Sequence, residues 1–415
     1  MRVLHLCYTD GRSGAGIGAF RLHQAMVRHG VDSWLVVAHK FTKDKRVVRM
    51  PRPQWRFRPI TRLNSAIFHT QTSGNPVYKS LNIFPTGTAA FLNRLGGDVI
   101  QMHWVGNHTI SIGEITRLKA PVFWKLPDMW AFSGTEHYML PTDPPRFEEG
   151  YRRDNRPRHE TGIDLNAWLW RYKKWRWRNA SFSIVCPSRW LADCARRSVL
   201  FRHRDITWIP NPIDLSLYRP MPKDEARAAF GLPRDRRLIL FASLNATADP
   251  RKGYHHLMAA IGRLADLVDP NATDLVVLGD DARQTTTMGG FTVHSLGKIF
   301  DEERIARAYN AADLFVLPTE ADNLPNSVKE ATACGIPCVG FDVGGMPDMV
   351  AHKETGYLAR PYDAEELAAG IAWVLERTGA ELSAKVRARA AALHDPGRCV
   401  ERYLDLYRRA CGRQG

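Results

Sequence analysis

The sequence predicts an α/β protein of two domains, each built on a parallel sheet. Its 415 residues exceed the roughly 250 to 300 that one hydrophobic core usually serves. The composition, 44% hydrophobic and 24% charged residues, is that of an ordinary globular protein. In both halves short apolar runs alternate with longer helical stretches, which is the pattern of βαβ units.

The first half begins with a βαβ unit. We expect a strand, a glycine turn, a helix and a second strand at residues 3–8, 14–18, 20–29 and 33–38. Apolar runs predict further strands at residues 98–103, 122–126 and 183–187.

The second half repeats the alternation. We expect strands at residues 206–209, 238–242, 275–278 and 314–317, with helices such as 254–267 between them. The basic content drops near residues 201–206, so we place the domains at 1–203 and 204–396. Residues 397–415 contain apolar positions at helical spacing and predict a final helix that packs back on the first domain.

Positive charge is concentrated in the first half. Residues 1–200 hold 31 Lys and Arg against 14 Asp and Glu, whereas the remainder holds 27 against 29. This asymmetry predicts an anionic partner, and a cytoplasmic membrane leaflet or a lipid-phosphate acceptor would fit. Nucleic acid would fit the charge as well, but no helix-turn-helix, RNP or zinc pattern accompanies it, so we expect no nucleic acid to bind.

Two segments, residues 40–62 and 152–178, carry most of the basic excess. On a helix Trp168, Tyr172 and Trp175 would share one face, while other tryptophans of the same segment point nearly the opposite way. Two interpretations stay open, namely contact with an anionic membrane surface and a solvated helix with packed aromatic residues.

The chain lacks the sequence signals of a membrane-spanning or exported protein. No apolar stretch approaches the roughly 18 residues that cross a bilayer, and the charged start leads into a strand. We therefore expect a cytoplasmic protein whose membrane contact is peripheral, at the inner membrane face. The seven cysteines are odd in number and show no zinc spacing, which predicts buried free thiols.

Gly14, Gly16 and Gly18 follow the first strand and suggest a dinucleotide-binding turn, since glycines let the backbone approach a pyrophosphate. Lys40 stands near the end of the second strand, where a nicotinamide site would need an acidic residue. We therefore favour a loop that closes over a bound phosphate or sugar.

The segment from Asp322 to Glu330 is the most informative in the chain. It follows the apolar run 314–318 and places two carboxylates around a turn that opens a helix. The amides of Asn326 and Ser327 would then form an anion site at the helix start, with Glu330 in the first turn. The alternative is a capping box, in which Glu330 only bonds back to a Ser327 cap.

Residues 249–253 follow a predicted strand and precede a helix. Arg251 and Lys252 beside Gly253 form a candidate diphosphate clamp, with lysine as a point charge and arginine as a fork. Taken alone, the same residues also fit a solvated turn.

In their order and spacing these segments resemble the retaining family 4 glycosyltransferases of the GT-B fold. The resemblance rests on residues 209–214, 251–253, 322–330 and 344–345 in the second half. In the first half, residues 15–18, 21–24, 103–104, 128–132 and 187–190 resemble the exopolysaccharide branch of that family, the colanic-acid type. The resemblance implies two Rossmann-like domains facing across a cleft, with a nucleotide-sugar donor held mainly by the second and an acceptor by the first.

The resemblance also implies roles for single residues. Glu330 would bond the ribose, Asp322 would contact hydroxyls of the transferred sugar, and Lys252 would neutralise the leaving diphosphate; these three are the candidate catalytic residues. No metal and no cofactor is implied, because the lysine and the helix N-termini supply the positive charge. The candidate donor-binding residues are Gly14, Gly16, Gly18, Arg251, Lys298, Ile299, Asn323, Leu324, Asn326 and Ser327.

The sequence departs from the family pattern at several places. Pro127 stands where the family usually has His, Asp322 replaces the commoner Glu, and Thr247 replaces a frequent arginine. The segment at residues 133–137 differs as well. His103 and His137 are candidates for the lost role, and with Asp128 they are the candidate acceptor-side residues, although a lone histidine is more often structural.

We therefore expect a retaining glycosyltransferase that moves a sugar from a UDP- or GDP-linked donor to a lipid-linked or polysaccharide acceptor. An alternative follows from Pro127. The chain would then be a catalytically impaired homologue that serves as a partner or acceptor-binding subunit.

Overall fold

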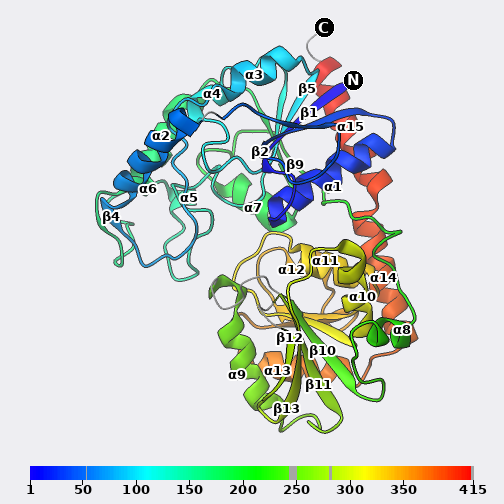
Figure 1. Cartoon of the computed structure of the whole chain (residues 1–415). Helices are drawn as coiled ribbons and strands as arrows, with labels where there is room; N and C mark the ends of the chain where they lie inside the picture. Colours follow the sequence, from blue (N-terminus) through cyan, green and yellow to red (C-terminus); the bar gives the residue numbers. More distant parts are fainter. Residues whose placement is uncertain (53, 243–249, 280–282, 413–415) are drawn as a thin grey trace. The chain divides into compact units, whose positions relative to one another are not determined.

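The computed structural model describes residues 1–52, 54–242, 250–279 and 283–412. The chain divides into two compact units, one of Met1–Pro212 with Gly397–Gly415 and one of Ile213–Pro396. Each unit contains a seven-stranded sheet flanked by helices (Figure 1). The predicted α/β class with parallel sheets is confirmed in both units.

The sheet of the first unit is parallel throughout and has the order β3-β2-β1-β5-β6-β8-β9. Numbered by position in this sheet, the order is 3-2-1-4-5-6 with one strand added, which is the doubly wound arrangement. The strands are β1 (Arg2–Thr9), β2 (Asp32–His39), β3 (Val47–Arg49), β5 (Val99–Met102), β6 (Val122–Lys125), β8 (Ser183–Cys186) and β9 (Ile206–Trp208).

The helices of the first unit vary from one turn to more than four. They are α1 (Gly14–Arg28), α2 (Gln54–Phe68), α3 (Thr88–Leu95), α4 (Ile112–Ile115), α5 (Arg146–Glu149), α6 (Leu165–Trp177), α7 (Arg189–Arg197) and α15 (Pro396–Gly412). A two-residue antiparallel pair, β4 (Gln71–Thr72) and β7 (Thr161–Gly162), joins two of the long connections.

The prediction of a glycine turn before the first helix is wrong. Helix α1 begins at Gly14, so the three glycines lie inside its first turns rather than in a loop. Ser13 caps the helix, because its Oγ accepts the Gly16 N–H at 3.1 Å. Gly16 also packs tightly, since a Cβ there would lie 2.8 Å from the Thr9 side chain.

The segment expected to begin the second sheet belongs to the first. Strand β9 pairs in parallel with β8, and the second unit starts only at Ile213, whereas our sequence boundary lay at residue 203. The drop in basic residues that suggested that boundary does not mark where sheet pairing ends.

Helix α15 completes the core of the first unit, as expected for the C-terminal segment. Val400, Tyr403 and Tyr407 are buried in a cluster that also contains Val3 of β1 and Leu22 of α1. Tyr407 Oη donates to Gln101 Oε1 at 2.6 Å, which satisfies a polar pair inside that core.

The sheet of the second unit has the order β12-β13-β11-β10-β14-β15-β16, and it is parallel except for β12. Its parallel part again reads 3-2-1-4-5-6. The strands are β10 (Arg237–Ala242), β11 (Thr273–Leu278), β12 (Arg283–Met288), β13 (Phe291–Leu296), β14 (Leu314–Leu317), β15 (Cys338–Phe341) and β16 (Gly356–Ala359).

Strand β10 shows why this sheet is covered on both faces. Leu238 and Leu240 join the cluster formed with α8, α10, α11 and α14, whereas Ile239 and Phe241 join the cluster formed with α9 and α13. The helices are α8 (Lys223–Ala228), the 3₁₀ turn η1 (Pro250–Lys252), α9 (Tyr254–Leu264), α10 (Glu302–Ala311), α11 (Asn326–Ala333), α12 (Met346–Met349), α13 (Ala364–Leu375) and α14 (Ala380–His394).

Within the described residues, no helix combines the length and the apolar character that a bilayer crossing requires. All seven cysteines are free; six are buried and Cys411 is half-buried. The expectation of free thiols is therefore confirmed.

Candidate active site

The central feature of the second unit is the switch point of its sheet, between β10 and β14. Ligands of doubly wound sheets bind beyond the carboxyl ends of the strands at this point, because the connections on either side run to opposite faces. The segment after β10 carries Arg251 and Lys252, and the segment after β14 carries Asp322. The topology therefore brings the predicted clamp and the first predicted carboxylate to one edge of the sheet.

Backbone and side-chain bonds join these two segments. The carbonyl of Arg251 accepts the Glu320 N–H at 2.8 Å and the Thr319 hydroxyl at 3.0 Å. The Arg251 guanidinium donates to the Ala321 carbonyl at 2.8 Å. The 3₁₀ turn after β10 and the loop after β14 thus form one connected structure.

Lys252 and Asp322 form the polar contact at the centre of this structure. Lys252 Nζ donates to Asp322 Oδ2 at 2.7 Å, and Arg251 Nη1 lies 3.8 Å from the same oxygen. Burial alone would raise the pKa of Asp322, but the charges of Lys252 and Arg251 together hold that pKa below its usual value. Asp322 is therefore a carboxylate at neutral pH, with two cations beside it.

Two glycines let the backbone approach this site closely. Gly253 has φ +70° and a Cβ there would lie 1.7 Å from the Pro318 carbonyl oxygen. Gly344 has φ +56° and a Cβ there would lie 2.0 Å from the Asp322 carbonyl oxygen. Only glycine fits these positions without a backbone shift, so both ends of the 318–322 loop depend on them.

The capping-box interpretation of Glu330 is wrong. The N-cap of α11 is Pro325 with no side-chain cap bond, and Ser327 lies inside the helix. No acidic residue lies in the first turn of α11, so Glu330 belongs to the second turn, which corrects our placement as well. Glu330 is only 8% exposed and accepts the Tyr309 hydroxyl at 3.1 Å.

The other donor-side candidates of the 323–327 stretch lie between the Asp322 loop and α11. Asn323 and Leu324 are buried, while Asn326 and Ser327 are half-buried at the start of the helix. The first turn of α11 directs backbone N–H groups toward its N-terminal side, as an anion site requires. Lys329, which the sequence reasoning missed, is fully buried there and donates to Asn326 Oδ1 at 2.9 Å.

Lys298 and Ile299 come shortly after the end of β13, and β13 lies two places from β10 in the sheet. Lys298 is exposed, and Ile299 packs partly against the core of the second unit. Thr247, the third departure from the family pattern, lies outside the described residues.

The glycine segment of the first unit contacts a buried lysine rather than closing as a loop. Lys125 Nζ donates to the Gly18 carbonyl at 3.3 Å and to Asn211 Oδ1 at 2.8 Å. Burial lowers the pKa of Lys125 to about 8. Gly14 and Gly16 stand at the N-terminus of α1, directly after β1.

Three acceptor-side candidates, His103, Asp128 and His137, line one small hollow of the first unit. Its volume is only about 10 Å³, and Pro127, Trp104 and Trp130 line it as well. Asp128 Oδ2 and His137 Nδ1 lie 2.6 Å apart, and the Trp104 indole donates to the same oxygen at 3.0 Å. His137 Nε2 lies 2.9 Å from Ser80 Oγ.

Asp128 and His137 form a defined acid–base pair. In a neutral imidazole the Nδ1 proton would face the carboxylate, which leaves Nε2 as the acceptor of the Ser80 hydroxyl. Pro127 stands beside the pair. This chain therefore lacks the histidine that the family pattern has at residue 127, but another histidine, His137, lies on the wall of the same hollow.

His103 has a different environment. Its Nε2 lies 2.9 Å from His5 Nδ1, and the rings stack with centroids 5.2 Å apart. Burial first, then the charge of Lys125, lowers the pKa of His103 well below its usual value. His103 is thus a neutral, buried residue, and among the described residues its Nδ1 has no hydrogen-bond partner.

The segment that carries Trp130 is held by a lysine that sequence reasoning missed. Lys173 of α6 is fully buried, and its ammonium donates to the carbonyls of Trp130, Ser133 and Gly134. Burial lowers the pKa of Lys173 well below its usual value. A lysine among tryptophans in a basic segment suggested surface charge, so the sequence alone offered no signal for this role.

Comparison with known proteins agrees with this geometry. Residues 236–377, which span β10 to α13, match the model of the family described as Glycosyl transferases group 1. The sucrose-phosphate synthase of Thermosynechococcus elongatus aligns over 99% of both chains with a TM-score of 0.67 and 19% identity. The HepE protein of Anabaena in complex with UDP and glucose aligns over 98% of this chain and 99% of its own, with a TM-score of 0.64 and 15% identity.

The chain has the GT-B fold of glycosyltransferases. Curated relatives include the D-inositol 3-phosphate glycosyltransferase of Mycolicibacterium smegmatis, 30% identical over 203 residues, which are 48% of this chain and 46% of that protein. The protein of the same name from Mycobacteroides abscessus is 33% identical over 197 residues, 45% of this chain and 41% of its own. The chain therefore covers less than half the length of either relative.

A further residue of the candidate site, Tyr309, could not be found from the sequence. Tyr309 of α10 lies fully buried beside Glu330, and burial together with the Glu330 charge raises the pKa of Tyr309 well above its usual value. The tyrosine therefore stays a hydroxyl donor. A buried Tyr–Glu pair could have been found only from the contact between α10 and α11.

Proposed function

We propose that this GT-B protein is a retaining glycosyltransferase of family 4 that uses a nucleotide-sugar donor, UDP- or GDP-linked. The observation that carries the proposal is the Lys252–Asp322 contact at the switch point of the second sheet, followed by Glu330 on α11. Three groups meet there: a cation, a carboxylate that can bond sugar hydroxyls, and a helix N-terminus that can bind an anion. Together they suit a sugar diphosphate.

The contact gives each residue a part in donor binding. With donor bound, Lys252 exchanges the Asp322 carboxylate for the diphosphate, and Asp322 is left to accept hydroxyls of the transferred sugar. Arg251 and the first turn of α11 add positive charge near the leaving group. Glu330, oriented by Tyr309, accepts the ribose hydroxyls.

The transfer breaks the bond between the sugar anomeric carbon and the diphosphate oxygen and forms a bond to the acceptor oxygen. The transition state has oxocarbenium character, and the departing phosphate takes the acceptor proton. Lys252 and the helix start stabilise the charge that develops on the leaving group. No metal ion or cofactor takes part in this step, so a chelator leaves transfer active.

The acceptor is proposed to be lipid-linked or polysaccharide, in the assembly of a cell-surface polysaccharide. The hollow of the first unit, with Asp128 and His137, offers an acid–base pair suited to contact acceptor hydroxyls. Two relatives are named for D-inositol 3-phosphate, so a soluble inositol phosphate belongs in any acceptor panel.

We propose peripheral contact with an anionic inner membrane, and an exposed aromatic face of α6 supports this proposal. Trp168 and Trp175 are 44% and 53% exposed, and Tyr172 between them stacks on Trp168 with parallel rings 5.8 Å apart. Exposed Arg171 and Lys174 flank this face. Aromatic residues among cations are typical of segments that bind the surface of an anionic bilayer. The expected test is cosedimentation with anionic vesicles, weakened in a Trp168→Ala, Trp175→Ala variant and absent with neutral vesicles.

The central experiment measures donor binding and transfer separately. Calorimetry with UDP, GDP and ADP identifies the base, and a radiolabelled nucleotide sugar incubated with membranes from the source shows transfer into the lipid or polysaccharide fraction. Lys252→Met serves as the matched variant, because it keeps the side-chain length and removes the charge. A chain that binds none of the three nucleotides is not a glycosyltransferase of this kind.

A second candidate function is favoured by Pro127, namely a catalytically impaired homologue that serves as a partner or acceptor-binding subunit. Pro127→His separates the two. A large gain of transfer supports the impaired homologue, whereas unchanged transfer, lost on His137→Asn, supports an enzyme that uses the histidine already in the hollow.

A further inference from the structure

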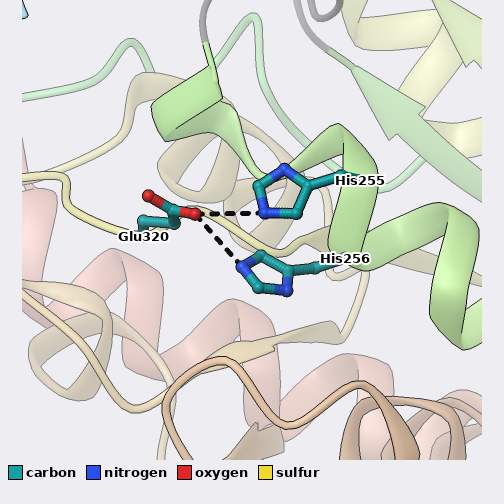
Figure 2. Close-up of side chains that lie close together, drawn as sticks. All are labelled: His255, His256 and Glu320. Atoms are coloured by element: carbon teal, nitrogen blue, oxygen red, sulfur yellow. Dashed lines mark hydrogen bonds and ion pairs between the residues drawn. The ribbon is translucent and has the colours of Figure 1, made fainter. Parts of the chain in front are cut away.

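Two histidines and a glutamate converge beside the proposed donor clamp but take no part in it. His255 and His256 are the second and third residues of α9, and Glu320 lies in the loop after β14. Both histidine Nε2 atoms lie 3.2 Å from Glu320 Oε1. Figure 2 shows the two rings directed at the same carboxylate oxygen.

The spacing of these atoms is that of metal ligands. One ligand atom from each residue lies within 4.8 Å of the other two, and in the described part of the chain no other group of three His, Cys, Asp or Glu meets this condition. Donors about 2.0 to 2.2 Å from one ion lie about 3 to 3.5 Å apart in tetrahedral or octahedral coordination. The two nitrogen–oxygen separations of 3.2 Å fall within that range.

We propose that His255, His256 and Glu320 bind one divalent first-row transition-metal ion of the Zn²⁺ type. Two imidazoles and one carboxylate form a ligand set that suits zinc, cobalt and nickel. Magnesium and calcium instead take oxygen ligands. Three protein ligands leave at least one coordination position for water or another ligand.

The ligands are held in place by contacts that do not involve an ion. The His256 ring stacks on Tyr362 at 5.8 Å and meets the edge of Phe341 at 5.1 Å. Tyr362 Oη donates to the Glu320 carbonyl at 3.2 Å. Such supporting contacts orient metal ligands before the ion arrives, and this lowers the cost of binding.

The electrostatics of the site act in both directions. A metal ion requires both imidazoles in the neutral form, and the Glu320 carboxylate attracts the cation. The start of α9 carries a partial positive charge that opposes a cation. The Glu320 carboxylate offsets that charge, so removing it is expected to weaken binding more than its single bond suggests.

The metal would link the two segments that carry the donor clamp. Glu320 lies two residues from Asp322, and its N–H already bonds the carbonyl of Arg251. An ion between α9 and the 318–322 loop adds a second tie and is expected to raise the melting temperature. The site itself does not depend on the proposed transferase activity.

The test is calorimetry of untagged protein with ZnCl₂, in a Cys411→Ser background because Cys411 is the one cysteine that is not buried. Binding of one ion per chain is expected, with Co²⁺ giving visible absorption bands of nitrogen and oxygen ligation and Mg²⁺ giving no heat. His255→Ala changes an exposed side chain, so the fold should survive it, and His203→Ala is the matched exposed-histidine control.

The proposal expects at least a tenfold loss of Zn²⁺ affinity in His255→Ala and Glu320→Gln, with none in His203→Ala. The metal-dependent rise in melting temperature should vanish in the same two variants while their metal-free melting temperatures stay near that of the parent. Equal Zn²⁺ affinity in parent and His255→Ala overturns the site. Nucleotide binding measured on the same proteins reports on the proposed function independently, because a failed metal site leaves it intact.

Discussion

Replacing Glu330 with glutamine tests the donor site at a buried carboxylate. Glu330 is 8% exposed and accepts the Tyr309 hydroxyl at 3.1 Å. Glutamine has the same size and still offers an oxygen to Tyr309, so the folded protein should lose only about 0.5–1.5 kcal/mol of stability. The ribose, by contrast, loses hydrogen bonds to a charged acceptor.

Bonds to a charged group contribute about 1.5–3 kcal/mol, which corresponds to a roughly 10- to 150-fold rise in the Kd for the nucleoside diphosphate. Calorimetry with UDP and GDP measures this rise, and thermal unfolding of the same samples measures stability. Tyr309→Phe is the matched control, since it removes the orienting hydroxyl and leaves the carboxylate. It should lower stability by about 1 kcal/mol and raise the Kd less than Glu330→Gln does. A Glu330→Gln protein that unfolds earlier yet binds nucleotide within twofold of the parent would refute the role in donor binding.

Three further outcomes are expected. Gly344→Ala should lower both melting temperature and donor affinity, because its Cβ would lie 2.0 Å from the Asp322 carbonyl oxygen. Lys252→Met should weaken diphosphate binding at least tenfold in calorimetry with little effect on binding of the uncharged nucleoside. Burial lowers the pKa of His23 to about 4 against the opposing pull of Asp44. The unfolded chain, with a histidine pKa of about 6.5, therefore binds this proton first, and stability should fall by about 1.3 kcal/mol between pH 7.5 and 5.5; His23→Gln should remove that part of the fall in denaturant titrations.

Several strands were located from the sequence because their apolar run is buried on both faces. Strands β1, β10 and β14 show this, since parallel strands between two helical layers read as continuous Val, Leu and Ile runs. Their order along the chain, with helices between, was enough to predict two parallel sheets. The switch point that positions Lys252 and Asp322 follows from strand order and needed the structure.

The hairpin of β12 and β13 was missed for a physical reason. Strand β12, Arg283–Met288, is a polar edge strand with five exposed residues, so it has no apolar period to detect. Gly289-Gly290 between the two strands is the one local signal, because both glycines have positive φ in a two-residue turn.

Local patterns failed where a tertiary contact decides the outcome. Ser327 to Glu330 has the spacing of a capping box, yet the helix starts at Asn326 after Pro325, since proline fixes φ and needs no N–H at a helix start. Gly14 looked like a turn residue, and Ser13 made it the first residue of a helix instead. The cap of α11 lies two residues before Ser327, and α1 begins six residues before the expected start at residue 20.

The two sheets share the order 3-2-1-4-5-6, so each unit offers the same kind of edge to a ligand, and their side chains then differ in charge. After β10 and β14 the second unit places Lys252 and Arg251 beside Asp322. After β1 the first unit places Arg12, whose guanidinium lies over the Phe41 ring, and a helix whose first turn has no charged side chain. The nearby Lys125 is buried and bonded to Asn211 and Gly18. The charge of a diphosphate can therefore be neutralised by side chains at the edge of the second sheet, whereas the first offers backbone amides and the Asp128–His137 pair. That difference follows from the residues after β10 and β14 in the second unit and after β1 and β6 in the first. It predicts that charge substitutions in the second unit change nucleotide affinity, while substitutions at Asp128 and His137 change transfer to the acceptor.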